Sequence, residues 1–278
     1  MPAQTWKTHW ENIDQSGDPQ HYVGLMAAIR KQHEEMVDIP RFLRFCDLHV
    51  GERVLDVGCG TGWHTRVASR MVGPTGRAVG IDLSETMLAE ARRDAAARGV
   101  DVDFVQGSAY SLPFEQNSFD CCYMLEVDDA MADPVQAVRE MIRVTRPGGH
   151  ICLLVHECDA VYIVPAGDPM TRRVLDFVRE HELSHPSGVE MMSILKSLGT
   201  TIEQVEDVLT HYGDSDDPFA DFASARAFFL DEWLADAVTA GVLASEEART
   251  WLADQKAHAG EGRFSLGFPA YIIKATRQ

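Results

Sequence analysis

Short apolar runs that end in glycine, proline or acidic residues recur along the chain and alternate with longer amphipathic stretches. Runs of this length are typical of buried strands, and their alternation with helix-like stretches is typical of a parallel sheet covered by helices. The runs predict strands at residues 54–57, 77–82, 102–106, 201–210 and 264–275, and two more beginning near Ser118 and after Gly149. We therefore expect an α/β fold with a seven-stranded, doubly wound, mostly parallel sheet.

The stretches outside these strands predict further helices. Residues 20–48 carry apolar side chains at helical spacing and are interrupted by Pro40, so one or two helices precede the sheet. Residues 157–186 show no regular pattern and are expected to form an irregular link to a helix at 187–198. Residues 216–260 predict two or three amphipathic helices that pack as an added layer, one end of which is placed to roof a substrate pocket.

Three glycines alternate directly after the first predicted strand: Gly58, Gly60 and Gly62. Glycines at this spacing let the backbone turn tightly and approach a ligand closely, because no side chain stands in the way. A dinucleotide-binding turn spaced G-x-G-x-x-G needs a third glycine at position 63, where the Trp63 indole would block close packing of helix on strand. The spacing therefore disfavours a nicotinamide or flavin cofactor. A glycine loop for another ligand and a plain strand-to-helix turn remain as alternatives.

The second predicted strand ends in Asp82, twenty positions after Gly62. A carboxylate at this place can accept hydrogen bonds from both hydroxyls of a bound ribose. The same side chain is also placed to help Ser84 cap the helix that follows. Both roles are compatible with the sequence, and the glycine loop that precedes Asp82 favours ribose binding.

Together, the glycine loop, Asp82 and the strand pattern make residues 54–155 similar to class I S-adenosylmethionine-dependent methyltransferases, in the branch of the ubiquinone and menaquinone C-methyltransferases. The resemblance implies S-adenosylmethionine as the cofactor. It also implies that Asp56 and the glycine loop, with Cys59, face the methionine end of this cofactor and that Asp82 binds its ribose.

The same resemblance assigns the adenine contacts. It places Leu83 and Met87 on the adenine face, and Ser108 with Ala109 at the adenine edge. Relatives commonly carry aspartate at the position of Ser108, whose hydroxyl is a weaker acceptor for the adenine amino group. Many relatives also carry histidine at or near Ala130, so no role of that histidine transfers to this chain. Glu126, in the same stretch, is expected either to touch the cofactor or to cap a turn.

The resemblance implies a lid role for the N-terminal helices, and the residue pattern gives the rest of the organisation. We expect lid helices, a cofactor-binding core, a helical cap and a final strand of the core sheet, at residues 1–48, 49–215, 216–260 and 261–278 respectively. Trp6, Trp10 and Tyr22 are then candidates either to close the cofactor site or simply to pack.

The charge of the chain narrows the class of substrate. The 278 residues include 43 acidic and 25 Lys or Arg residues, for a net charge of −18, which disfavours a nucleic-acid partner. One predicted helix carries Arg139, Arg143 and Arg146, and we interpret them as its solvent-exposed face. No run of eighteen apolar residues and no signal-peptide core occur, so we expect a cytoplasmic protein without membrane contact.

The six cysteines show no metal-ligand spacing, so we expect buried free thiols and no metal. Cys121 and Cys122 are adjacent on one predicted strand and should point to opposite faces of the sheet. An arsenic methyltransferase, which needs cooperating thiols, is therefore disfavoured.

The chain is thus expected to transfer a methyl group from S-adenosylmethionine to O, N or C of a small organic molecule, in biosynthesis or specialised metabolism, as a monomer or homodimer. A base is needed where the acceptor atom carries a proton. His156, at the exit of the fifth strand, is the first candidate, followed by Glu157, Asp129 and Glu126; a hydrogen-bonded loop histidine is the alternative. Two other functions stay open: a cyclisation or decarboxylation supported by the bound cofactor, and cofactor sensing without catalysis.

Overall fold

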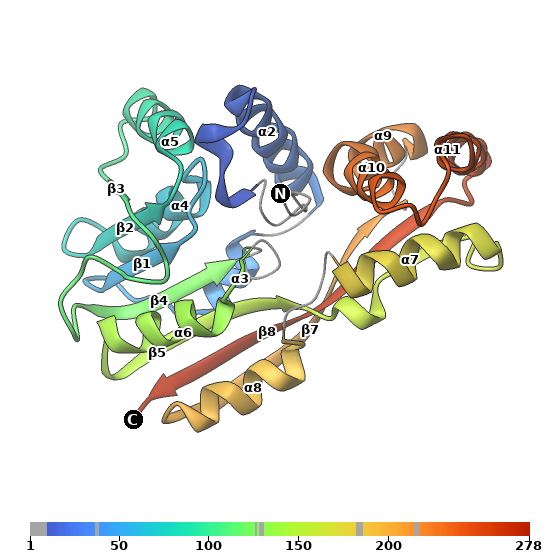
Figure 1. The fold of residues 1–278 in the computed structure, drawn as a ribbon. Coiled ribbons are helices and arrows are strands. Elements are labelled where there is room, and N and C mark those ends of the chain that lie inside the picture. Colours follow the sequence, from blue (N-terminus) through green and yellow to red (C-terminus); the bar gives the residue numbers. More distant parts are fainter. Residues whose placement is uncertain (1–9, 37–38, 126, 128–130, 182–185, 214–216) are drawn as a thin grey trace.

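The computed structural model describes residues 10–36, 39–125, 127, 131–181, 186–213 and 217–278. In this part of the chain a sheet of eight strands forms the centre of the molecule, in the order β3-β2-β1-β4-β5-β8-β6, with β7 also paired to β8 (Figure 1). The strands are β1 Arg53–Val57, β2 Arg77–Asp82, β3 Asp103–Gln106, β4 Phe119–Leu125, β5 Thr145–His156, β6 Tyr162–Val164, β7 Thr200–Tyr212 and β8 Ser265–Arg277.

The first five strands are parallel, and β8 runs antiparallel to β5, β6 and β7. This arrangement confirms the predicted doubly wound, mostly parallel α/β fold, and all seven predicted strands are present. The eighth, β6, was not predicted. It is three residues long and pairs with the start of β8, on the side of β8 where β5 also pairs.

Helices surround the sheet on both faces. They are η1 Ile13–Gln15, α2 Pro19–Met36, α3 Ile39–Phe45, α4 Trp63–Val72, α5 Glu85–Ala97, α6 Pro134–Val144, η3 Cys158–Ala160, α7 Pro169–His181, α8 Gly188–Ser197, α9 Pro218–Ala225, the π-helical turn η4 Arg226–Leu230, α10 Asp231–Thr239 and α11 Ser245–Gly260.

Two apolar cores lie against the two faces of the sheet because side chains alternate along each strand. Cys121 and Tyr123 belong to the core under α3 and α4, whereas Cys122 and Met124 belong to the core under α6 and α8. The two adjacent cysteines therefore point to opposite faces, as predicted. The five cysteines whose side chains the structure describes are all buried and free, and the side chain of Cys158 lies outside the described residues.

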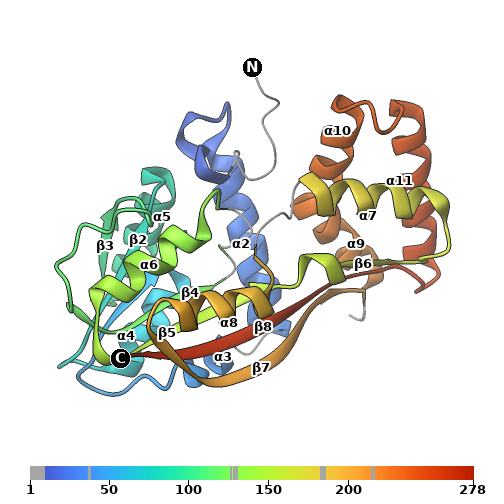
Figure 2. The same ribbon diagram turned by 60° about the horizontal axis from the view of Figure 1, so that its bottom comes forward.

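A third core lies at the far end of the long strands β7 and β8, where α7, α9, α10 and α11 gather (Figures 1 and 2). Trp233 of α10 is fully buried there, and Phe268 of β8 packs beside it with a ring-centroid separation of 5.9 Å. The Trp251 indole N–H donates to the Thr171 hydroxyl at 2.9 Å, which joins α11 to α7. The aromatic positions of residues 216–260 thus pack mainly against β7, β8 and α7.

The irregular link predicted for residues 157–186 is wrong, because α7 occupies much of it. The Asp168 carboxylate accepts hydrogen bonds from the N–H groups of Met170 and Thr171, both at 3.1 Å, and caps the helix start. Pro169 follows as the first residue, where its missing N–H costs nothing. The same Asp-Pro pair at 133–134 predicts α6 correctly, so this signal was present in the sequence.

The two N-terminal helices, α2 and α3, pack against different parts of the molecule. Pro40 is the second residue of α3, where a proline is tolerated, and α3 packs Leu43 and Phe45 into the core of one sheet face. Helix α2 instead lies beside α5 (Figure 1), and its Met26 lies against the glycine turn after β1. None of the helices among the described residues is both long enough and apolar enough to cross a membrane.

Helix α9 offers a matched test of the third core. Phe222 is 3% exposed and packs edge-on against Phe264, whereas Phe219 on the same helix is 52% exposed. Phe222→Ala should lower the free energy of unfolding by about 3–5 kcal/mol, and Phe219→Ala by less than about 1 kcal/mol. Urea titration followed by circular dichroism measures both. Equal losses in the two variants would show that the helices do not share a packed core.

Candidate active site

The turn after β1 has three glycines with left-handed backbone, Gly58, Gly60 and Gly62, at φ angles of 74°, 52° and 72°. A Cβ on Gly58 would lie 2.6 Å from Cγ1 of Val127, and one on Gly62 would lie 2.4 Å from the Phe104 ring. Both positions therefore exclude any side chain. Gly62 also stands directly before α4, so the turn delivers the helix N-terminus next to the end of β1.

The glycine turn is fastened to β2. The N–H groups of Gly58 and Cys59 donate to the Ile81 carbonyl at 2.8 and 3.0 Å, and the Gly60 N–H donates to Asp82 Oδ2 at 2.8 Å. Cys59 packs against Gly80, where a Cβ would come within 2.8 Å of its sulfur. Burial, with the nearby Asp82 and Asp56 carboxylates, raises the pKa of the Cys59 thiol well above its ordinary value. Cys59 is therefore an unreactive packing residue of the turn.

Asp82 fulfils the capping role considered from the sequence. Its Oδ1 accepts the Ser84 N–H at 2.9 Å, while the Ser84 hydroxyl accepts the Met87 N–H at 3.2 Å and caps α5. Asp82 thus accepts one of these N–H groups on each carboxylate oxygen, and a carboxylate has about four acceptor positions, so capacity remains for ribose hydroxyls. Capping and ribose binding are compatible. Burial raises the pKa of Asp82 above its ordinary value, and hydrogen bonds from Ser84 and Gly60 oppose this rise.

Asp56 is a buried carboxylate beside the glycine turn. Its Oδ2 accepts the Thr65 hydroxyl at 2.6 Å, and Tyr123 is its partner in the parallel register of β1 and β4. Burial raises the pKa of Asp56 from 3.8 to about 7; hydroxyls of Thr65 and Tyr123 oppose the rise, and the charge of Asp82 adds to it. A cation placed beside a buried carboxyl group with a raised pKa stabilises its ionised form. Thr65 and Tyr123 had not been singled out from the sequence, because their approach depends on the register of two strands and a helix.

The residues assigned to the adenine differ in exposure. Leu83, directly after β2, is 49% exposed, whereas Met87 is 1% exposed and is covered by Ile13 and Tyr22. The Ser108 hydroxyl accepts the Tyr110 N–H at 3.2 Å, and Ala109 is half-buried beside it. Leu83 and Ser108 thus lie at the surface of the site, and Met87 lies beneath a cover.

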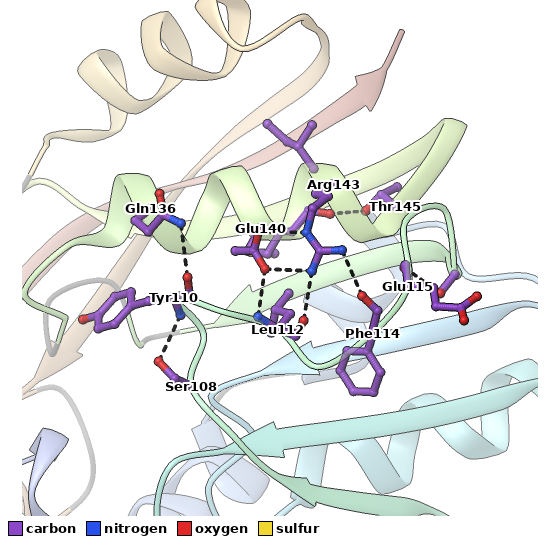
Figure 3. Close-up of polar contacts among 12 residues, drawn as sticks. Ser108, Tyr110, Leu112, Phe114, Glu115, Gln136, Glu140, Arg143 and Thr145 are labelled. Atoms are coloured by element: carbon purple, nitrogen blue, oxygen red, sulfur yellow. Dashed lines mark hydrogen bonds and ion pairs between the residues drawn. The ribbon is translucent and has the colours of Figure 1, made fainter.

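The loop that carries Ser108 and Ala109 is held by α6 (Figure 3). The Arg143 guanidinium donates to the carbonyls of Leu112 and Phe114, both at 2.9 Å, and to the Glu140 carboxylate at 2.8 Å. Glu140 in turn accepts the Leu112 N–H at 2.8 Å. The solvated face expected for these arginines is therefore wrong for Arg143, which fixes the loop backbone, and Arg146 lies on β5 and not on this helix.

The two predicted bases that the structure describes, His156 and Glu157, face different surroundings. His156 ends β5 on the α3 and α4 side, is 7% exposed, and packs edge-on against Phe268. Glu157 faces the start of α8, where its Oε1 accepts the Val189 N–H at 3.4 Å. Asp129 and Glu126, together with Ala130 and Trp6, lie outside the described residues. His156 therefore stays the first candidate, on the sheet face that it shares with Asp56.

Comparison with known proteins finds a family that matches the part of the chain carrying this site. Residues 55–153 match the family described as methyltransferase domain, so this part of the chain carries a methyltransferase domain, and the predicted resemblance is confirmed there. The ubiquinone/menaquinone biosynthesis C-methyltransferase UbiE of Hahella chejuensis is 41% identical over 109 residues, which cover 38% of this chain and 44% of that protein.

Two further proteins resemble the chain over most of its length. An uncharacterized 37.1 kDa protein in transposon TN4556 of Streptomyces fradiae is 29% identical over 234 residues, covering 82% of this chain and 64% of that protein. A solved SAM-dependent methyltransferase from Aquifex aeolicus has a TM-score of 0.51 at 19% identity and covers 86% of this chain and 92% of that one, which shows a shared fold. The chain spans less than two thirds of the length of the curated relatives it matches here.

The raised pKa of Asp56 makes stability depend on pH. Between about pH 4 and pH 7 the folded protein keeps a proton on Asp56 that an unfolded chain releases, so this group's contribution to stability falls as pH rises through that window. In Asp56→Asn, the loss in free energy of unfolding between pH 4 and pH 7 should be smaller by on the order of 2 to 4 kcal/mol. Thermal unfolding between pH 4 and pH 8 measures it. Asp254→Asn, at an exposed position on α11, is the control and should follow the parent protein. An unchanged pH dependence in Asp56→Asn would contradict the assignment.

Proposed function

We propose that this protein is an S-adenosylmethionine-dependent methyltransferase that methylates O, N or C of a small organic molecule. The observation that carries the proposal is the turn with glycine at positions 58, 60 and 62, which is fastened to Asp82 and flanked by buried Asp56. The methyltransferase domain at residues 55–153 supports the same conclusion.

The residues present fit this cofactor. Asp82 has the acceptor directions that two ribose hydroxyls need, and Asp56, with a pKa of about 7, gains from a neighbouring cation such as the amino group of a methionine moiety. Leu83 offers an exposed apolar surface for the adenine face. Ser108 would accept at the adenine edge. The assignment of these residues follows the family pattern except at Ser108, where relatives commonly carry aspartate.

Methyl transfer requires mainly that the protein places the cofactor and the acceptor correctly. Bound S-adenosylmethionine supplies an activated methyl group on a sulfonium, which an acceptor attacks in line. The chain's own residues hold the cofactor, orient the acceptor and exclude water, and orientation of this kind supplies much of the rate. The clamp of Arg143 and Glu140 on the loop after β3 supports such a fixed geometry.

The charge and the thiols support a small acceptor in the cytoplasm. A net charge of −18 repels a phosphate backbone, so a small metabolite is favoured over nucleic acid as the acceptor. Five buried free thiols suit a reducing compartment. We infer a monomer or a homodimer that acts in biosynthesis or specialised metabolism.

Product analysis separates methyl transfer from its alternatives. The protein is incubated with isotopically methyl-labelled S-adenosylmethionine and a panel of phenols, amines and quinol-type carbon acids, followed by mass spectrometry. We expect equal amounts of demethylated cofactor and labelled acceptor. An altered acceptor without demethylated cofactor would mean cyclisation or decarboxylation instead. Tight cofactor binding without turnover across the panel would mean a sensing role.

The base assignment has its own test on β5. His156 and His150 lie on the same strand and the same face, with His150 near Thr276 toward the other end. With an acceptor that must lose a proton, His156→Gln should lower kcat on the order of 100-fold, with little change in KM for the cofactor. His150→Gln should keep the parental kcat. Full turnover of His156→Gln across the pH range would eliminate His156 as the base.

A further inference from the structure

The N-terminal segment, defined as residues 10–26, touches three separate parts of the candidate cofactor site. Asp14 reaches the start of α5, and Glu11 reaches the loop after β3. Met26 lies against the glycine turn, where a Cβ on Gly60 would be 3.5 Å from its terminal methyl. One short piece of chain therefore borders the places assigned to ribose, adenine and methionine.

Asp14 binds the first turn of α5 from far away in the sequence. Its Oδ1 accepts the Ser84 hydroxyl at 2.6 Å and the Thr86 N–H at 3.1 Å, and its Oδ2 accepts the Glu85 N–H at 2.7 Å. Burial alone would raise the pKa of Asp14, but hydrogen bonds from Ser84, Thr86 and Glu85 hold it below its ordinary value. The contact is thus made by an ionised carboxylate at a helix N-terminus, where negative charge is favoured.

Glu11 makes the second contact. Its carboxylate accepts the Tyr110 hydroxyl and, at 3.0 Å, the Ala132 N–H. Burial and the hydrogen bond to Glu11 raise the pKa of Tyr110 to about 12, so the phenol stays a neutral donor. Tyr110 lies on the same loop as Ser108, whose hydroxyl accepts its N–H. Glu11 therefore fastens the segment to the loop assigned to the adenine edge.

Apolar side chains fill the space between the two anchors. Ile13 and Tyr22 pack on Met87, and the Trp10 ring meets Tyr22 edge-on at 5.3 Å. Met87 is left 1% exposed. An adenine ring that is to reach Met87 must therefore pass beneath this cover or displace it.

We propose that Glu11 and Asp14 are positioning residues that clasp the N-terminal segment over the cofactor site and control how fast cofactor and demethylated product enter and leave. The inference rests on the proposed function for the identity of the ligand. Opening the clasp separates two carboxylates from five donor groups. Hydrogen bonds to ionised groups are about twice as strong as neutral ones, so neutralising either carboxylate weakens closure.

Three single substitutions of an acid by its amide test the clasp. Asp14→Asn and Glu11→Gln each break one anchor, because an amide offers one acceptor oxygen and brings a donor toward donors. Asp18→Asn is the matched control: Asp18 lies in the same segment, is exposed, and accepts the N–H of His21 in α2, the helix that it directly precedes. Amide hydrogen exchange of the ligand-free proteins is read over residues 10–26 and 84–88. Stopped-flow displacement then gives the dissociation rate of S-adenosylhomocysteine.

We expect Asp14→Asn and Glu11→Gln to raise exchange in the segment and the dissociation rate about tenfold each, the effect of losing one charged hydrogen-bond anchor. Asp18→Asn should match the parent in both measurements. The clasp is refuted if both anchor variants exchange and dissociate like Asp18→Asn. If Asp14→Asn does not fold, the Glu11→Gln variant at the other anchor tests the clasp by itself. If the parent protein binds no S-adenosylhomocysteine, the proposed function fails, whereas the exchange measurement still decides the clasp.

Discussion

The hydrogen bond from the Gly60 N–H to the Asp82 carboxylate, 2.8 Å long, joins the turn after β1 to the end of β2. The turn has left-handed backbone at Gly58, Gly60 and Gly62, which by itself favours no single ligand. The half-buried Asp82 carboxylate holds this turn at Gly60, between Asp56 of β1 and the start of α4. The same carboxylate orders the start of α5 through Ser84. The candidate cofactor site and the start of α5 therefore share one carboxylate.

The long strands β7 and β8 extend this parallel core into a second body of helices. Helix α2 connects the two, because Leu25 packs both against the third core and within the cluster that covers Met87. Burial raises the pKa of Tyr22 on α2, and the charge of Glu232 on α10 raises it further. Changes in the helical layer can therefore reach the N-terminal segment by direct contact. The appended helices therefore pack against the same helix that covers Met87.

The strands and the glycine turn were predictable from sequence because their signals are local: apolar runs, alternating glycines and an acid after the second strand. Helix α7 was missed although Asp168-Pro169 carries a local cap signal. Contacts between distant segments had no such signal. Glu11 and Asp14 look like ordinary surface acids, and Thr65 and Tyr123 meet Asp56 because a helix and a neighbouring strand bring them there. Arg143 differed from its expected solvated role for the same reason, since its partners lie on a loop some thirty residues away.

Isothermal titration calorimetry of the purified protein with S-adenosylmethionine, S-adenosylhomocysteine and NAD tests the central claim most directly. If the turn joined to Asp82 forms an adenosyl-sulfonium site, both sulfur nucleosides bind at one site per chain and NAD gives no heat. A heat of binding with NAD and none with either sulfur nucleoside would contradict the account.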